Sequence, residues 1–121
     1  MQTILLDTDY VIDFLQGKSS VIVPLIQNNI AFLSILSVYE LYAGMRPDEE
    51  QATNDFIQAC HIEYVTMDIA KQAGMNRFKK RQQGITLSIV DCIIAETASA
   101  NHHLVATHNK KHYPDSVFWK C

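Results

Sequence analysis

The chain has 121 residues, of which 48% are hydrophobic and 19% charged, and its formal net charge is −3. This composition excludes a disordered chain, and the length fits one compact domain over residues 1–121. The chain has no basic surplus, so any surface that binds nucleic acid has to be local.

Cysteines and apolar runs bear on the compartment. The three cysteines, Cys60, Cys92 and Cys121, are odd in number and form no CxxC pair. This pattern favours a reducing cytoplasm over a secreted disulfide framework. No segment resembles a signal peptide, and no apolar run approaches the ~20 residues that span a bilayer. We therefore expect a cytoplasmic protein without membrane contact.

The first elements in chain order are a strand and two helices. Residues 3–6 are short, apolar and partly β-branched, which predicts a buried strand of a parallel sheet. Thr8 or Asp9 then caps a helix over residues 10–16. A second helix is expected within residues 21–27, beginning near the proline of that segment.

The middle of the chain predicts a second strand over residues 30–33. Ser37 and Glu40 follow with the spacing of a capping box, which places Ser37 at the N-cap and Glu40 at N3 of a helix. Another helix is expected over residues 48–59, and residues 62–65 predict a third strand.

The last part of the chain begins with a long predicted helix over residues 67–83, whose second half is basic. Ser88 and Asp91 form a second capping box ahead of another helix. Residues 104–106 predict a fourth strand, and residues 117–119 a short fifth. Because strands alternate with helices, we predict an α/β fold: a central, mostly parallel sheet of four or five strands flanked by helices in three layers.

Three acidic residues stand where such a fold builds its sites. Asp7 ends the first strand, and Glu40 and Asp91 are expected in the first turns of helices. Sites of open α/β sheets lie at the carboxyl ends of the strands, so these acids can gather at one edge. Gathered carboxylates repel one another, and a hard divalent cation such as Mg²⁺ or Mn²⁺ relieves that repulsion.

Each acid also has a simpler explanation. Asp7 could cap the helix that follows it, and Glu40 and Asp91 could serve only as capping-box partners. An acid in the first turn of a helix also gains from the helix dipole. Residue chemistry alone leaves both explanations open.

Four segments carry motifs in a set order. They are residues 5–15 (LLDTDYVIDFL), 36–44 (LSVYELYAG), 88–98 (SIVDCIIAETA) and 104–113 (LVATHNKKHY). Their order and spacing resemble the PIN domain, a family of metal-dependent ribonucleases, and most closely its bacterial VapC-type toxins. The resemblance spans nearly the whole chain, and it is the combination of motifs that is specific.

The resemblance implies a three-layer PIN-like fold and a metal-dependent endoribonuclease that hydrolyses RNA phosphodiesters. Asp7, Glu40 and Asp91 would hold Mg²⁺ or Mn²⁺ and form the catalytic cluster. The family usually adds a polar or acidic residue in its last loop, where this chain offers Asn109 as a catalytic residue, or His112. Because a fourth carboxylate is missing there, one metal is expected rather than two.

The resemblance also implies partners. These are the RNA substrate, a second copy in a homodimer, and a VapB-like antitoxin that covers the acidic cleft with an arginine or lysine. A groove for the antitoxin could be formed by apolar residues on two helices, and ordinary core packing is the alternative for some of them. The groove candidates are Val11, Phe14, Leu15, Leu41 and Tyr42.

Three further interpretations stay open at this point. The chain could be a non-catalytic PIN-like module that binds RNA or protein, or a nuclease that acts on DNA. Asp9, where the family motif has Asn or Ser, could add negative charge to the cluster. The basic run Arg77–Arg81 could be a solvated helix face or could contact phosphate at the rim of the cleft.

Overall fold

The computed structural model describes residues 2–120, so Met1 and Cys121 lie outside the described residues. A four-stranded sheet has the order β3-β2-β1-β4, and all three strand pairs are parallel. The strands are β1 (Ile4–Leu6), β2 (Ala31–Ser34), β3 (His61–Glu63) and β4 (Leu104–Ala106). The predicted α/β class and the parallel sheet are therefore confirmed.

The sheet has four strands and no complete fifth one among the described residues. Near the predicted fifth strand, Phe118 forms a single parallel bridge with Val105 of β4. The first and last strands are neighbours: Ile4 pairs with Leu104, and Leu5 pairs with Val105. Residues near the start and the end of the domain therefore lie side by side, with β1 inside the sheet and β4 at its edge.

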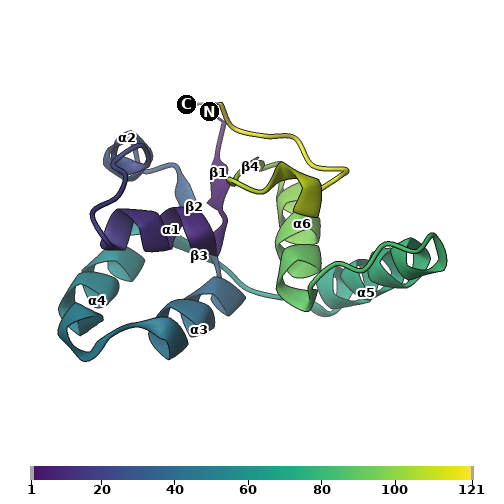
Figure 1. The fold of residues 1–121 in the computed structure, drawn as a ribbon. Coiled ribbons are helices and arrows are strands. Elements are labelled where there is room, and N and C mark those ends of the chain that lie inside the picture. Colours follow the sequence, from purple (N-terminus) through teal and green to yellow (C-terminus); the bar gives the residue numbers. More distant parts are fainter. Residues whose placement is uncertain (1, 121) are drawn as a thin grey trace.

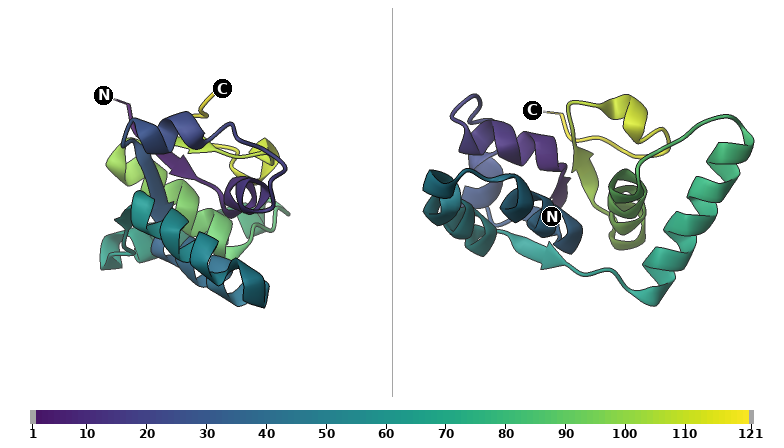
Figure 2. Two further views of the ribbon diagram at one scale, coloured as in Figure 1. Left: turned by 90° about the vertical axis from the view of Figure 1, so that its left-hand side faces the viewer. Right: turned by 60° about the horizontal axis from the view of Figure 1, so that its bottom comes forward.

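Helices cover both faces of the sheet, which gives three layers (Figures 1 and 2). One side carries α1 (Thr8–Leu15), α2 (Val23–Gln27), α3 (Ile35–Gly44) and α4 (Glu50–Ala59), with the 3-10 turn η1 (Pro47–Glu49) before α4. The other side carries α5 (Met67–Gln82) and α6 (Ile89–Asn101). A second 3-10 turn, η2 (Lys110–His112), follows β4. No helix within residues 2–120 has the length and apolar character that crossing a membrane requires.

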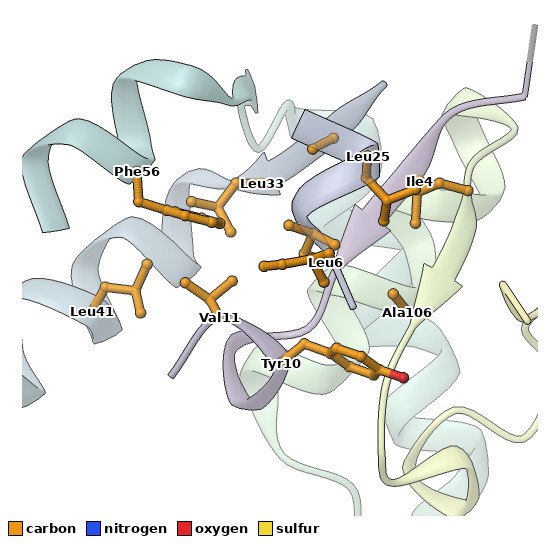
Figure 3. Packing of buried hydrophobic residues seen from close by; sticks show 11 residues of the cluster. Ile4, Leu6, Tyr10, Val11, Leu25, Leu33, Leu41, Phe56 and Ala106 are labelled. Carbon is orange, nitrogen blue, oxygen red and sulfur yellow. The ribbon is translucent and has the colours of Figure 1, made fainter. Parts of the chain in front are cut away.

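The core explains why the strands read as continuous apolar runs. Leu6 and Leu33 point to the side of α1–α4, where they pack with Val11 and Phe56 (Figure 3). Leu5 belongs to a second buried cluster together with Ile94, Ala98, Val105 and Tyr113. Neighbouring residues of one strand thus enter opposite layers, as the alternation of side chains in a strand requires.

One predicted helix start was wrong. Helix α3 begins at Ile35, and its N-cap is Ser34, whose hydroxyl accepts a hydrogen bond from the Leu36 N–H at 3.2 Å. Strand β2 runs directly into this helix, so the last residue of the strand provides the cap. Ser37 is therefore buried inside the helix, and Glu40 lies in its second turn rather than at N3.

Other helix boundaries follow the prediction more closely. Ser88 caps α6 by accepting from the Asp91 N–H at 3.0 Å. Helix α2 begins at Val23, with Pro24 in its first turn. The cap of α1 is Asp7 rather than Thr8 or Asp9, because the helix begins directly after the strand.

Two of the candidates for the antitoxin groove are core residues, which is the alternative expected for some of them. Val11 is fully buried and Leu41 is nearly so, and both belong to the core beneath α1–α4. Phe14 packs against Phe56 with ring centroids 5.5 Å apart. These side chains cover one face of the sheet, because the strands of a parallel sheet are buried on both faces.

Candidate active site

An open cleft with a volume of about 600 Å³ contains the acids that the sequence singled out. Asp7, Glu40 and Asp91 line it together with Asp9. The remaining lining residues are Thr8, Ile12, Arg77, Ser88, Ile89, Val90 and His112. The cleft thus draws on the end of β1, on α1 and α3, and on the first turn of α6, as the parallel topology predicts.

Asp7 is buried at the junction of β1 and α1. Its backbone N–H donates to the Ala106 carbonyl at 2.9 Å, which fixes it beside β4. Its Oδ2 accepts from the Thr107 hydroxyl at 2.7 Å. Although Asp7 occupies the N-cap position of α1, its side chain makes no capping hydrogen bond. The hydrogen bond from Thr107, and not the end of the helix, therefore orients the carboxylate.

Burial raises the pKa of Asp7 above its ordinary value. The Thr107 hydrogen bond opposes that change, and the negative charges of Asp9 and Asp91 add to it. Burial and the neighbouring charges therefore disfavour the ionised form of Asp7, and a bound cation would stabilise that form.

Asp91 has both carboxylate oxygens engaged. Oδ1 accepts from the Tyr113 hydroxyl at 3.0 Å, and Oδ2 lies 3.3 Å from His112 Nδ1. Thr107, at the start of the same segment, is the donor to Asp7. The segment after β4 therefore reaches back to both acids and joins them.

Glu40 is oriented by a different contact. The Thr8 hydroxyl lies 2.7 Å from Glu40 Oε1, to which it donates, and 2.9 Å from the Ser37 hydroxyl. Because Glu40 stands in the second turn of α3, it is not a capping-box partner. The simple capping explanation fails for this residue and for the Asp7 side chain.

The last loop brings two polar residues to different places. Asn109 donates from its side-chain amide to Asp9 Oδ2 at 3.0 Å, rather than to Asp7 or Asp91. His112 lines the cleft and contacts Asp91. Of the two candidates for the fourth corner, His112 contacts Asp91, and the side chain of Asn109 contacts Asp9.

The donor set can be compared with what a metal ion needs. Within residues 2–120, no three His, Cys, Asp or Glu side chains form a complete ligand set as they stand. The acids of the cleft nevertheless offer only oxygen donors, and burial together with the charges of Asp9 and Asp91 raises the pKa of Asp7. Such donors fit a hard cation such as Mg²⁺ or Mn²⁺, which keeps water ligands beside a few carboxylates.

Arg77 is the only lysine or arginine that lines this cleft among the described residues. Its Nε donates to the Leu87 carbonyl at 2.8 Å, which ties α5 to the segment before α6. Lys80, in the same basic run, instead lies 3.3 Å from Asp115. The basic run Arg77–Arg81 therefore does not act as one surface, because Arg77 lines the cleft and Lys80 pairs with Asp115.

Cys92 does not contribute a nucleophile to this cleft. It is buried in α6, as expected, and burial raises the pKa of its thiol. A raised pKa disfavours the thiolate that a cysteine nucleophile requires. Cys92 and Cys60 are both free.

The hydroxyls of Thr8, Thr107 and Tyr113 were not predicted as site groups from the sequence. Thr107 follows the last strand directly, and that position at a carboxyl edge is a usable signal. Tyr113 lies inside the fourth motif segment, but its contact with the acids depends on how the loop folds back.

Comparison with known proteins agrees with the geometry. The sequence profile of the PIN domain matches residues 4–113. The chain is 34% identical over 116 residues to ribonuclease VapC19 of Mycobacterium tuberculosis, covering 91% of each chain. It is 30% identical to ribonuclease VapC10 of the same organism, covering 92% of this chain and 86% of the relative.

Solved structures share the fold at low identity. A DNA-bound VapBC from Salmonella typhimurium aligns with a TM-score of 0.81 at 19% identity, covering 99% of this chain and 98% of the other. VapBC-1 of nontypeable Haemophilus influenzae aligns at 0.80 and 18%, covering 98% of both. FitAcB of Neisseria gonorrhoeae aligns at 0.78 and 20%, covering 98% and 97%.

Proposed function

This chain belongs to the PIN-domain family of VapC-type ribonucleases, and from that premise we propose that it cleaves RNA in the cleft lined by Asp7, Glu40 and Asp91. The observation that carries the proposal is the gathering of these acids in one cleft without capping bonds at Asp7 and Glu40. PIN-domain ribonucleases generally use divalent metals, and here the proposed ion is Mg²⁺ or Mn²⁺.

The three carboxylates would hold the metal, with Asp7 and Asp91 as the paired donors and Glu40 completing the set. When bound, such an ion supplies a Lewis acid that lowers the pKa of water and offsets charge on a phosphodiester. Thr107 and Thr8 orient Asp7 and Glu40 by hydrogen bonds of 2.7 Å each. One metal is proposed, because the last loop brings His112 to the acids and no fourth carboxylate.

The substrate would enter along the open side of the cleft. RNA should be single-stranded at the cut, where the backbone can bend toward the acids. Arg77 would contact a phosphate, since its guanidinium lines the cleft and is anchored through Nε to the Leu87 carbonyl. A local cation of this kind explains how a chain with a net charge of −3 could hold RNA.

We propose two protein partners, a VapB-like antitoxin and a second copy of this chain. The solved relatives named VapBC and FitAcB support the first. An antitoxin arginine or lysine would pair with the acids of the cleft. Exposed apolar side chains at Tyr39, Tyr64 and Met67 are available for a homodimer. The protein would act in the cytoplasm, where it meets cellular RNA.

The proposal is tested by incubating the purified chain with single-stranded RNA and DNA under Mg²⁺ and Mn²⁺. We expect cleavage of RNA that EDTA abolishes and that Asp7→Asn with Asp91→Asn removes. Asp48→Asn, which changes an exposed acid in η1, is the matched control and should cleave normally. Cleavage of DNA alone would identify a DNA nuclease. RNA binding without cleavage would identify a non-catalytic module.

A further inference from the structure

The Tyr113 hydroxyl bonds one acid of the cleft directly and acts on a second. It donates to Asp91 Oδ1 at 3.0 Å, and it stabilises the charge of the Asp7 carboxylate. These acids come from β1 and α6, which are 84 positions apart in the sequence (91 − 7). Tyr113 belongs to neither element, since it follows η2 in the segment after β4.

The ring of Tyr113 is held rigidly. It is completely buried and packs in the cluster of Leu5, Ile94, Ala98 and Val105, which joins the sheet to α6. The hydroxyl is therefore fixed by the same packing that fixes β1 and α6. A buried ring keeps its polar tip in one place at little entropic cost, because its two torsions are already restrained.

The chemistry of the contact is that of a neutral donor between two negative groups. Two carboxylates brought together without a donor or a cation repel each other. The phenol donates its one hydrogen to Asp91, which offsets part of that repulsion.

We propose that Tyr113 is a positioning residue that holds Asp7 and Asp91 at a set separation, so that the pair is ordered before a divalent cation binds. This inference rests on the proposed function, because it assigns the pair to a metal. It adds a hydroxyl that touches neither metal nor substrate but decides how well the two acids are placed. Contacts of this kind orient ligands, and their loss typically costs about 10–100-fold in metal affinity.

The test uses Tyr113→Phe, which removes the hydroxyl and keeps the ring. The matched control is Tyr42→Phe, because the Tyr42 hydroxyl bonds Asn54 Oδ1 at 2.6 Å and does not line the cleft. The Mn²⁺ dissociation constant of each folded protein is measured by titration calorimetry, well below its melting temperature. We expect the constant to rise about tenfold in Tyr113→Phe and to stay unchanged in Tyr42→Phe.

The outcomes separate this inference from the proposed function. Equal Mn²⁺ affinity in wild type and Tyr113→Phe overturns the positioning role, even if Tyr113→Phe melts earlier, since a purely structural hydroxyl changes stability alone. A wild-type chain that binds no Mn²⁺ overturns the metal site itself, and the inference with it.

A second measurement covers the case in which Tyr113→Phe does not fold. Wild-type protein carrying 3-fluorotyrosine is titrated with Mg²⁺ and followed by ¹⁹F NMR. The Tyr113 resonance should move as the two acids take up the ion, while the Tyr42 resonance should not. A Tyr113 resonance that stays fixed while Mg²⁺ binds contradicts the inference.

Discussion

The side-chain amide of Asn109 donates a hydrogen bond to Asp9 Oδ2 at 3.0 Å, which ties the loop after β4 to the first turn of α1. The backbone N–H of Asn109 donates to Thr107 Oγ1 at 2.9 Å, and that hydroxyl donates to Asp7. Asn109 thus begins a short chain of hydrogen bonds that runs through Thr107 to the buried Asp7. Its side chain contacts Asp9, and its catalytic role stays a prediction.

These hydrogen bonds predict how Asn109→Ala changes the rate of cleavage. Loss of the amide frees Asp9 and loosens the loop that carries Thr107, so we expect cleavage to slow by up to about tenfold, the equivalent of one hydrogen bond. Single-turnover cleavage of a defined RNA measures this. Asn54→Ala, which removes the partner of Tyr42, is the control and should cleave at the wild-type rate. A slowing of more than 100-fold would instead place Asn109 among the groups that contact the reacting atoms.

Asp9 itself can be tested separately, because its charge raises the pKa of Asp7. If Asp9 contributes negative charge to the metal site, Asp9→Asn should weaken Mn²⁺ binding by a few-fold, as expected for a nearby exposed charge. Calorimetry at low salt gives the affinity. Full retention of both Mn²⁺ affinity and cleavage would remove Asp9 from the site.

The raised pKa of Asp7 predicts how metal-free stability depends on pH. An acid with a raised folded pKa favours the folded state most below its unfolded value, near 3.8, and this contribution is lost as pH rises through the folded pKa. Asp7→Asn should therefore stabilise the metal-free protein at neutral pH. A relief on the order of 1 kcal/mol would raise the melting temperature by about 4 °C.

The check is a set of melting curves from pH 4 to pH 8 with EDTA. The difference between Asp7→Asn and wild type should shrink as the pH falls toward the unfolded value. Added Mg²⁺ should stabilise wild type and leave Asp7→Asn unchanged. An Asp7→Asn protein that is less stable than wild type at neutral pH would contradict the claim that ionised Asp7 destabilises the metal-free fold.

Thr107→Val removes the donor to Asp7 while keeping the shape of the side chain. The ionised Asp7 then loses its compensation for burial, and the metal-free protein should lose about 1–3 kcal/mol at neutral pH. Urea denaturation measures the free energy of unfolding. Thr97→Val is matched in burial, but its hydroxyl bonds only the Ile93 carbonyl of its own helix at 2.7 Å. It should cost less, and equal losses would show that Thr107 has no special link to the acid.

Arg77→Ala should weaken RNA binding more than it slows the chemical step. Because the guanidinium lines the cleft, we expect KM to rise about tenfold, with a smaller dependence of binding on salt. Arg81→Ala is the matched control from the exposed face of α5 and should leave KM nearly unchanged. Melting curves must accompany both, since the Arg77–Leu87 hydrogen bond also joins two segments. Equal KM values in the two variants would assign the basic run to solvent alone.

Much of the fold could be predicted because the strands are short runs that are apolar on both faces. Such runs occur in parallel sheets, and the residues that end them lie at the edge where sites form. Asp7 was found in this way, and Asp91 through the serine that caps its helix. These signals are local, so a single sequence is enough to detect them.

Other features depended on contacts that no local pattern records. The start of α3 was misplaced because Ser34 and Ser37 both suit an N-cap, and only the direct passage from β2 into the helix selects Ser34. Tyr113 has the composition of a core residue, and its contact with Asp91 depends on the path of the loop.

The pairing of β1 with β4 has a consequence for biosynthesis. Asp7 lies near the start of the domain, yet its neighbours Ala106 and Thr107 lie near the end of the domain. Contacts of such large sequence separation form late and slowly during folding. A partly synthesised domain therefore has no assembled cleft, and the proposed cleavage requires the segment after β4 to be in place.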